Sequence, residues 1–206
     1  MKTAKEKVSY CIGLETAKNL KHQFSDIDDN RLKEGFHDAL EGLQPKLSQD
    51  EIKNVMMALR RQIETQQKEF ITKVSKHNKE AGEAFLQQNK EKSGITVLPS
   101  GLQYKVIQEG NGVMPTLTDV VTVQYKGKFI DGKVFENSYD NEKPPTLPVA
   151  RTIPGWAEAL QLMKVGDKWE IFVPSYLAYG EAGFSPVIPP NTTLVFEMEL
   201  LGVNGQ

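Results

Sequence analysis

Apolar residues recur at helical spacing over residues 4–24, which predicts a helix with one main apolar face formed by Val8, Ile12, Ala17, Leu20 and Phe24. A second helix is predicted after Asp28 or Asp29, either of which can cap it, and Gly42 ends it. Its apolar positions are Leu32, Phe36, Ala39 and Leu40. Two such short helices cannot bury their apolar faces in a monomer. We therefore expect them to pack against a second copy of the chain.

A capping-box pattern, Ser48-Gln-Asp-Glu51, opens a third predicted helix that reaches about Lys90 and is roughly 60 Å long at ~1.5 Å per residue. Its first half continues the apolar repeat through Ile52, Met56, Leu59, Ile63, Phe70 and Val74. The stretch from Gln66 to Glu80 is mostly polar, which indicates a solvated strut. A coiled coil is the alternative, but the repeat fades after Val74.

After residue 94 the pattern changes to short β-rich runs bounded by Gly, Pro, Asn and Asp, and five strands are predicted: 102–108, 120–130, 133–135, 168–173 and 193–203. Asp131-Gly132 predicts a two-residue hairpin turn between the second and third of them. One short helix is predicted to start at Pro154, to contain Trp156, Ala159, Leu160 and Met163, and to end before Gly166.

These elements predict an α+β protein in which an antiparallel sheet wraps around one short helix and follows an all-α region. We divide the chain into a helical dimerisation region at 1–46, a long connecting helix at 47–94 and a β-rich domain at 95–206. The aromatic residues follow the same division. The only ones that precede residue 95 are Tyr10, Phe24, Phe36, Phe70 and Phe85.

Charge and hydropathy exclude several classes of partner. The formal net charge is −2 and neither half of the chain is strongly basic, so no nucleic-acid partner is expected. No apolar run approaches the ~20 residues needed to span a bilayer. The first residues lack the apolar core of a signal peptide, which predicts a cytoplasmic location. If a signal peptide has been removed, the location is periplasmic or at the cell surface.

The chain also lacks the residues of several common catalytic sites. His22, His37 and His77 are scattered through the helical region without the spacing of metal ligands, so no metal is expected. No Ser or Cys nucleophile has a plausible His partner, and no dinucleotide or phosphate loop is present. We therefore expect no cofactor and no covalent chemistry.

Five separated strings in the β-rich part carry aromatic and apolar residues between turns: Tyr125-Lys-Gly127, Asp131-Gly132 with Phe135, Ile153-Pro-Gly-Trp156, Leu177-Ala-Tyr-Gly180, and Ile188-Pro-Pro190 followed by Thr193-Leu-Val-Phe196. In this order they resemble the FKBP-type peptidyl-prolyl cis-trans isomerases, from about Leu98 to Leu201. The helical arm is similar to that of the bacterial macrophage-infectivity-potentiator (Mip-like) branch, whose members are homodimers.

The resemblance implies a pocket with Trp156 as its floor and with walls formed by Tyr125, Phe135, Ile153, Tyr179, Ile188 and Phe196. For each of these residues taken singly, core packing is the alternative. The resemblance also implies that the Tyr179 hydroxyl and the Ile153 backbone N–H contact ligand carbonyls. An acidic residue after Phe135 would contact the Tyr125 hydroxyl, and here it is Glu136, one methylene longer than the Asp common in the family.

The activity implied is non-covalent rotation of Xaa-Pro bonds in unfolded or partly folded proteins, which assists their folding. Macrolides such as tacrolimus or rapamycin would be inhibitors, and the homodimer would form through residues 1–46. The alternative is a dimeric chaperone in which the pocket only docks proline-containing segments.

Overall fold

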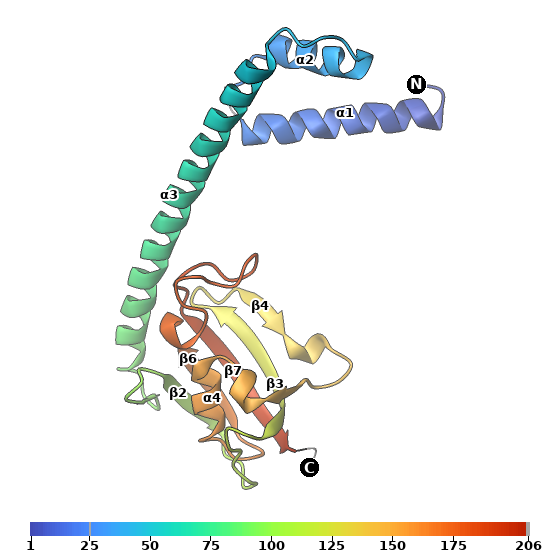
Figure 1. The fold of residues 1–206 in the computed structure, drawn as a ribbon. Helices are drawn as coiled ribbons and strands as arrows, with labels where there is room; N and C mark the ends of the chain where they lie inside the picture. Colours follow the sequence, from blue (N-terminus) through green and yellow to red (C-terminus); the bar gives the residue numbers. More distant parts are fainter. Residues whose placement is uncertain (25, 205–206) are drawn as a thin grey trace. The chain divides into compact units, whose positions relative to one another are not determined.

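The computed structural model describes residues 1–24 and 26–204, which form two compact units, Met1–Gln62 and Ile63–Gln206 (Figure 1). The described residues contain four α-helices: α1 Ala4–Gln23, α2 Asp29–Glu41, α3 Gln49–Asn89 and α4 Pro154–Leu160. Three short 3₁₀ helices cover Ser138–Asp140, Val149–Arg151 and Ser175–Leu177. The predicted α+β class, with an all-α region before the sheet, is confirmed.

The predicted capping residues are found at both ends of α2 and at the start of α3. The Asp28 carboxylate accepts hydrogen bonds from two backbone N–H groups at the start of α2, and Gly42 ends that helix with a φ of 66°. At α3 the predicted capping box is present. The Glu51 N–H donates to the Ser48 hydroxyl over 3.2 Å, and the Ser48 N–H donates to the Glu51 carboxylate over 2.8 Å.

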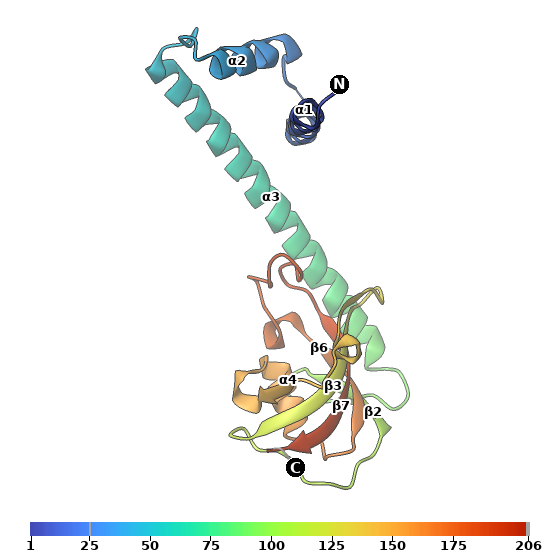
Figure 2. The ribbon, with the colours of Figure 1, turned by 90° about the vertical axis from the view of Figure 1, so that its right-hand side faces the viewer.

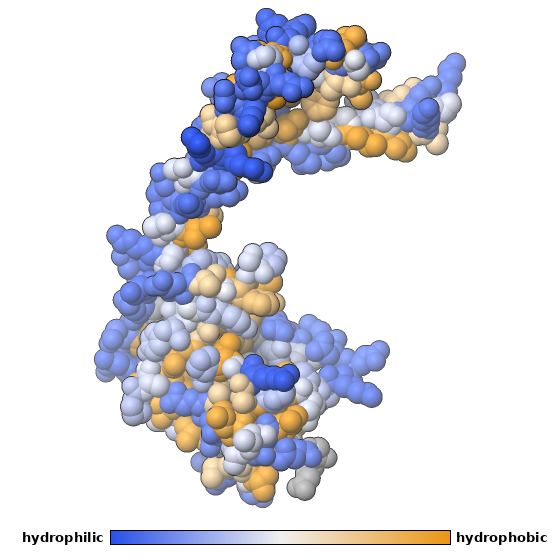
Figure 3. All heavy atoms as spheres, in the orientation of Figure 1, coloured by the Kyte–Doolittle hydropathy of each residue, from blue (hydrophilic) through white to orange (hydrophobic). Residues whose placement is uncertain are grey.

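The first unit has no core of its own. None of its described residues is buried, and its apolar side chains lie at the surface, as the space-filling view of α1 also shows (Figure 3). Ile12 is 62% exposed and Leu40 is 82% exposed. A unit of this size needs buried apolar area to stay folded. The described part of this unit therefore leaves its apolar faces in contact with solvent.

In the second unit, the last part of α3 corrects the prediction of a solvated strut. Residues 64–73 are exposed, as predicted, but from Val74 onward one face of the helix is partly or wholly buried. Phe85 packs on Phe172 with ring centroids 6.0 Å apart, and a Cβ added at Gly82 would collide with the Thr193 side chain. The prediction weighed apolar side chains only, whereas this face also packs through small and polar residues.

The sheet is antiparallel throughout, and its strands are β1 Thr96–Val97, β2 Gln103–Gln108, β3 Val120–Phe129, β4 Val134–Asn137, β5 Thr146–Pro148, β6 Lys168–Val173 and β7 Leu194–Val203. Their order is β1-β2-β6-β7-β3-β4, with β5 paired to β3. The five predicted strands are present. The sequence did not predict β1 and β5, because runs of two or three residues are too short to show alternation.

The β3–β4 hairpin is present, but its turn differs from the two-residue turn predicted at Asp131-Gly132. The Gly132 N–H donates to the Phe129 carbonyl and the Phe129 N–H donates to the Lys133 carbonyl, each over 2.9 Å. Gly132 has a φ of 87°, whereas Asp131 has a negative φ. A two-residue type I′ turn needs positive φ at both positions, so this connection is a three-residue loop with a bulge at Gly132.

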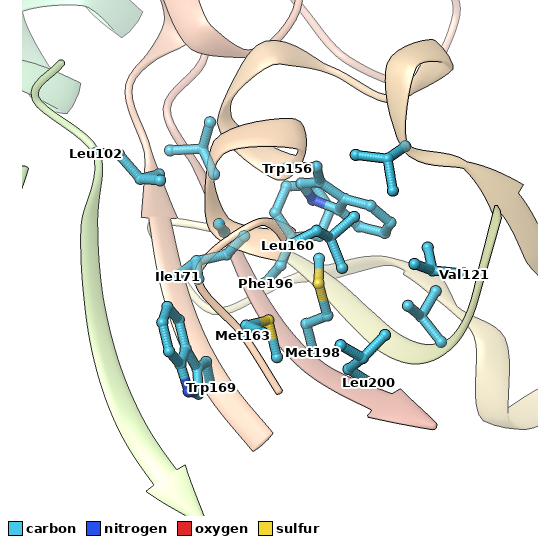
Figure 4. Packing of buried hydrophobic residues seen from close by; sticks show 14 of the residues in the cluster. Leu102, Val121, Trp156, Leu160, Met163, Trp169, Ile171, Phe196, Met198 and Leu200 are labelled. Carbon is cyan, nitrogen blue, oxygen red and sulfur yellow. The ribbon is translucent and has the colours of Figure 1, made fainter. Parts of the chain in front are cut away.

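Helix α4 lies against one face of the sheet (Figures 1 and 2). Trp156 and Leu160 of α4 enter a core shared with Ile171 of β6 and Met198 of β7 (Figure 4). The helix starts at Pro154 as predicted but ends at Leu160, so Met163 lies outside it. Met163 is nevertheless fully buried. The last turn tightens, because the Leu162 N–H bonds to the Ala159 carbonyl three residues back.

Candidate functional site

Four aromatic rings from four different elements meet beside α4. The Trp156 ring lies edge-on to Tyr125 of β3 and to Phe196 of β7, with centroid distances of 4.7 and 5.1 Å. Phe135 of β4 lies edge-on to Phe196 at 5.8 Å. Edge-to-face packing at these distances fixes each ring by its neighbours. The fold thus joins residues separated by up to 71 positions into one aromatic cluster.

Burial divides the predicted site residues into a floor and a rim. Trp156, Ile188 and Phe196 are 5% exposed or less. Tyr125, Phe135, Ile153 and Tyr179 are half-buried and pack against the core. The eighth residue, Glu136, is exposed on β4. A buried floor with half-exposed aromatic rings around it offers apolar surface to a ligand.

The polar groups at this rim differ in whether they have a hydrogen-bond partner within the protein. The Tyr125 hydroxyl donates to the Glu136 carboxylate over 2.6 Å, so the longer side chain at this position reaches the hydroxyl. By contrast, neither the Tyr179 hydroxyl nor the Ile153 N–H donates a hydrogen bond to another residue in the described part of the chain. These two donors are available to acceptors on a ligand.

The electrostatic surroundings keep both phenols neutral. Burial raises the pKa of Tyr125, and the hydrogen bond to Glu136 raises it further. Burial also raises the pKa of Tyr179, and the negative charge of Glu136 adds to that effect. Both hydroxyls therefore remain hydrogen-bond donors across the physiological pH range.

Because the pKa of Tyr125 is higher in the folded protein than the ~10 of an unfolded chain, folding stability should fall as pH rises above 10. Below that pH this contribution is fully present. We expect the melting temperature of wild type to drop more between pH 9 and pH 11 than that of Tyr125→Phe, which lacks the ionising group. Thermal melts at both pH values measure this. Parallel losses in the two proteins would contradict the assignment.

Two residues that the sequence analysis did not single out hold the cluster in place. The Tyr125 N–H donates to the Ser138 hydroxyl over 2.7 Å, and that buried hydroxyl in turn donates to the Gln124 side chain. Gly127 is also required, since a Cβ there would press into the rings of Phe135 and Phe196. The Tyr-Lys-Gly string was a signal for Gly127, but no local pattern pointed to Ser138.

In residues 1–24 and 26–204, no group of three or more His, Cys, Asp and Glu side chains is placed to hold a metal ion. Within the same residues, no helix is long and apolar enough to cross a bilayer.

Comparison with known proteins connects this cluster to a family. The model described as the domain amino terminal to FKBP-type peptidyl-prolyl isomerase matches residues 5–106, and that of FKBP-type peptidyl-prolyl cis-trans isomerase matches residues 112–201. The chain is 40% identical to the peptidyl-prolyl cis-trans isomerase Mip of Coxiella burnetii, over 98% of this chain and 88% of that protein. The chain belongs to the FKBP-type peptidyl-prolyl cis-trans isomerase family.

Other relatives match over nearly the whole chain. The outer membrane protein MIP of Legionella longbeachae is 44% identical over 98% of this chain and 86% of its own length. The FKBP-type 22 kDa isomerase of Escherichia coli is 39% identical over 98% of this chain and 96% of its own length. The crystal structure of FkpA from Escherichia coli matches this chain with a TM-score of 0.79 at 33% identity. The match covers 99% of this chain and 98% of the FkpA chain.

These similarities confirm the predicted activity and its Mip-like branch. The protein is an FKBP-type peptidyl-prolyl cis-trans isomerase that acts in protein folding. Its substrates are accordingly proline-containing polypeptides. The alternative of a chaperone whose pocket only docks such segments is not favoured, because the relatives are named as isomerases.

Proposed function

We propose that the aromatic cluster beside α4 is the catalytic site of this FKBP-type isomerase, formed by Tyr125, Phe135, Glu136, Ile153, Trp156, Tyr179, Ile188 and Phe196. The observation that carries the proposal is the convergence of rings from β3, β4, α4 and β7 on one buried floor with a half-exposed rim. In addition, the Tyr179 hydroxyl and the Ile153 N–H at that rim have no hydrogen-bond partner among the described residues, so both can donate to a ligand.

Such a surface suits the rotation of an Xaa-Pro bond. Rotation breaks the resonance of the imide, which is a barrier of ~18–20 kcal/mol in water. The twisted transition state has lost the conjugation that polarises the carbonyl, so an apolar surround disfavours the planar ground state more than the twisted state. In this mechanism the proline ring rests on Trp156, and no nucleophile is needed.

Hydrogen bonds at the rim would orient the peptide on this floor. The Tyr179 hydroxyl and the Ile153 N–H donate to ligand carbonyls, because each lacks a partner within the described residues. The Tyr125 hydroxyl is already engaged with Glu136, which holds the Tyr125 ring against Trp156. Orientation of the peptide then precedes rotation.

Removal of one rim donor tests the assignment. We expect Tyr179→Phe to lower kcat/KM for a short Xaa-Pro peptide about 3- to 10-fold, the loss typical of one hydrogen bond. Tyr176→Phe is the matched control, since the Tyr176 hydroxyl bonds to the Ser100 carbonyl and its ring is 65% exposed away from the cluster. Equal activity of both variants in a peptide isomerisation assay would remove Tyr179 from the site.

Macrolides such as tacrolimus or rapamycin are proposed inhibitors of the same surface. A rigid apolar ligand could cover the Trp156 floor and accept hydrogen bonds from Tyr179 and Ile153, at little cost in conformational entropy. Inhibition should then be competitive with a proline peptide. Isothermal titration with tacrolimus, repeated on Phe135→Ala, checks this, since binding that survives the substitution would place the macrolide elsewhere.

For the helical part of the chain, residues 1–94, we propose that residues 1–46 form a homodimer and that 47–94 is the helix connecting it to the isomerase domain at 95–206. The support is the absence of any buried residue in the described part of the first unit. In addition, α2 and the segment after it border a hollow of about 580 Å³, whose apolar lining comes from Ala39, Leu43, Pro45, Leu47 and Ile52. A helix of a second copy would fill such a hollow.

For the location, we propose export to the periplasm or the cell surface, the alternative to the cytoplasmic location predicted from the sequence. A cytoplasmic location gains no support from the relatives, and one of them is named an outer membrane protein. Cell fractionation of the source organism with an antibody to the isomerase domain tests this. Recovery of the protein with cytoplasmic markers would overturn the proposal.

A further inference from the structure

One loop follows Tyr179 of the proposed site directly and carries another of its residues, Ile188. It runs from Gly180 to Thr192. Ile188 is buried in the core cluster, whereas Phe184 and Val187 of the same loop are exposed. The Phe184 ring lies against Tyr179 with centroids 5.3 Å apart. The position of this loop therefore sets the distance between Ile188 and the rest of the cluster.

Backbone hydrogen bonds within the loop link its tip and its base. At its tip, Phe184 and Ile188 exchange two backbone hydrogen bonds, both of 2.7 Å. At its base, the Asn191 N–H donates to the Gly180 carbonyl over 2.8 Å. Asn191 holds a φ of 53°, a conformation that Asn tolerates better than most residues. The position of Asn191 is thus coupled to that of Gly180 at the other end of the loop.

Helix α3 holds this base through side chains rather than through apolar packing. The Asn191 amide donates to the Ser75 hydroxyl over 2.8 Å. The Asn78 amide donates to the Pro190 carbonyl over 2.9 Å and to the Thr192 hydroxyl over 3.3 Å. These partners are separated by more than 110 positions in the chain, and all of them belong to the second unit.

The loop has little other support on this side. A cavity of about 430 Å³ lies next to Asn78 and is lined by the β3–β4 turn at Phe129–Asp131 and by Pro189 and Thr192. Core packing fixes Ile188, but the space beside the base of the loop is open, so packing on this side does not determine where residues 189–192 lie. The hydrogen bonds from α3 do so instead.

We propose that Ser75 and Asn78 are positioning residues of the isomerase site, acting through Asn191 and Pro190 to place the loop that carries Ile188. They touch no substrate. Because Phe184 and Val187 belong to the same loop, α3 also sets how the enzyme discriminates among peptides that differ beside the proline. This inference rests on the proposed site. It gives α3, which precedes the proposed isomerase domain at 95–206, a role in positioning a residue of that site.

Substitutions in the full-length protein test it. Asn78→Asp has nearly the same shape but cannot donate to the Pro190 carbonyl, and Ser75→Ala removes the acceptor for Asn191. Lys79→Ala, on an exposed position of the same helix, is the control. We expect each of the first two to lower kcat/KM about 3- to 10-fold, by different factors for peptides with Leu and with Ala before proline.

The two-peptide comparison separates positioning from loss of folded protein, since a smaller folded fraction lowers both rates equally. Ser75→Thr keeps the hydroxyl and should restore the wild-type ratio of the two rates. If Ser75→Ala and Asn78→Asp keep both rates or lower them by one common factor, the inference is wrong. Should this happen while Tyr179→Phe still loses activity, the proposed site stands and only the role of α3 fails.

Discussion

Replacing Phe135 with alanine should lower kcat/KM for a short Xaa-Pro peptide by about 10- to 100-fold, which corresponds to roughly 1.4–2.8 kcal/mol of lost transition-state stabilisation. The Phe135 ring forms a wall of the proposed site, where it packs on Phe129 at 5.0 Å and on Phe196 at 5.8 Å. Without it, water reaches the floor at Trp156, and the apolar surround that favours the twisted imide is lost.

The fold should survive this change, because Phe135 is half-buried and lies at the edge of the core rather than inside it. Phe70→Ala is the matched control, since it deletes the same side chain from a position on α3 that is 69% exposed. Isomerisation of a short peptide and a thermal melt are measured on both variants. A folded Phe135→Ala protein with the wild-type rate would show that catalysis takes place elsewhere.

If the proposed dimer forms through the first unit, charge placed on the apolar faces of that unit should convert the dimer to a monomer. We expect this of the double variant Ile12→Glu and Leu40→Glu, because burying two carboxylates in an apolar interface costs several kcal/mol. Since the described part of this unit has no buried residue, its helices should also lose order when the dimer separates. Sedimentation and far-ultraviolet circular dichroism report these two changes.

The catalytic consequence of that variant should depend on the substrate. Its rate on a short peptide should equal wild type, whereas its acceleration of proline-limited refolding of a whole protein should fall about 10-fold or more, because two linked sites retain a client better than one. Lys18→Glu, which changes the charge at an exposed position paired with Glu15, is the control. A monomeric variant that refolds proteins as fast as wild type would separate dimerisation from activity.

Elements with strong local signals were predicted well. Helix α1 was predicted from its apolar spacing, and α2 and α3 also from the caps Asp28, Gly42 and the Ser48–Glu51 box, which act within a few residues. The strand β6 was predicted at its observed bounds. The errors lie where local signals are short or ambiguous: the β5 strand, the turn at Gly132 and the last turn of α4.

Long-range polar contacts account for what the sequence did not reveal. Ser138 supports Tyr125 from 13 residues away, and Ser75 and Asn78 reach the loop at residues 190–192 across most of the chain. In the sequence, a Ser or Asn side chain that makes a tertiary contact looks the same as one that faces solvent, because neither adds to an apolar repeat. For this reason the stretch from Gln66 to Glu80 was predicted to be a solvated strut, although one face of α3 is partly buried from Val74 onward.

The sequence by itself determined the order of helices and strands and the strings that identify an FKBP-type isomerase, because both depend on residues close together in the chain. Only the tertiary structure decided that Ile188 and Phe196, predicted as walls, are buried together with Trp156, and that the longer Glu136 reaches the Tyr125 hydroxyl over 2.6 Å. It also decided that α3 holds the loop of Ile188. These depend on contacts between distant segments, which exist only once the sheet has closed around α4.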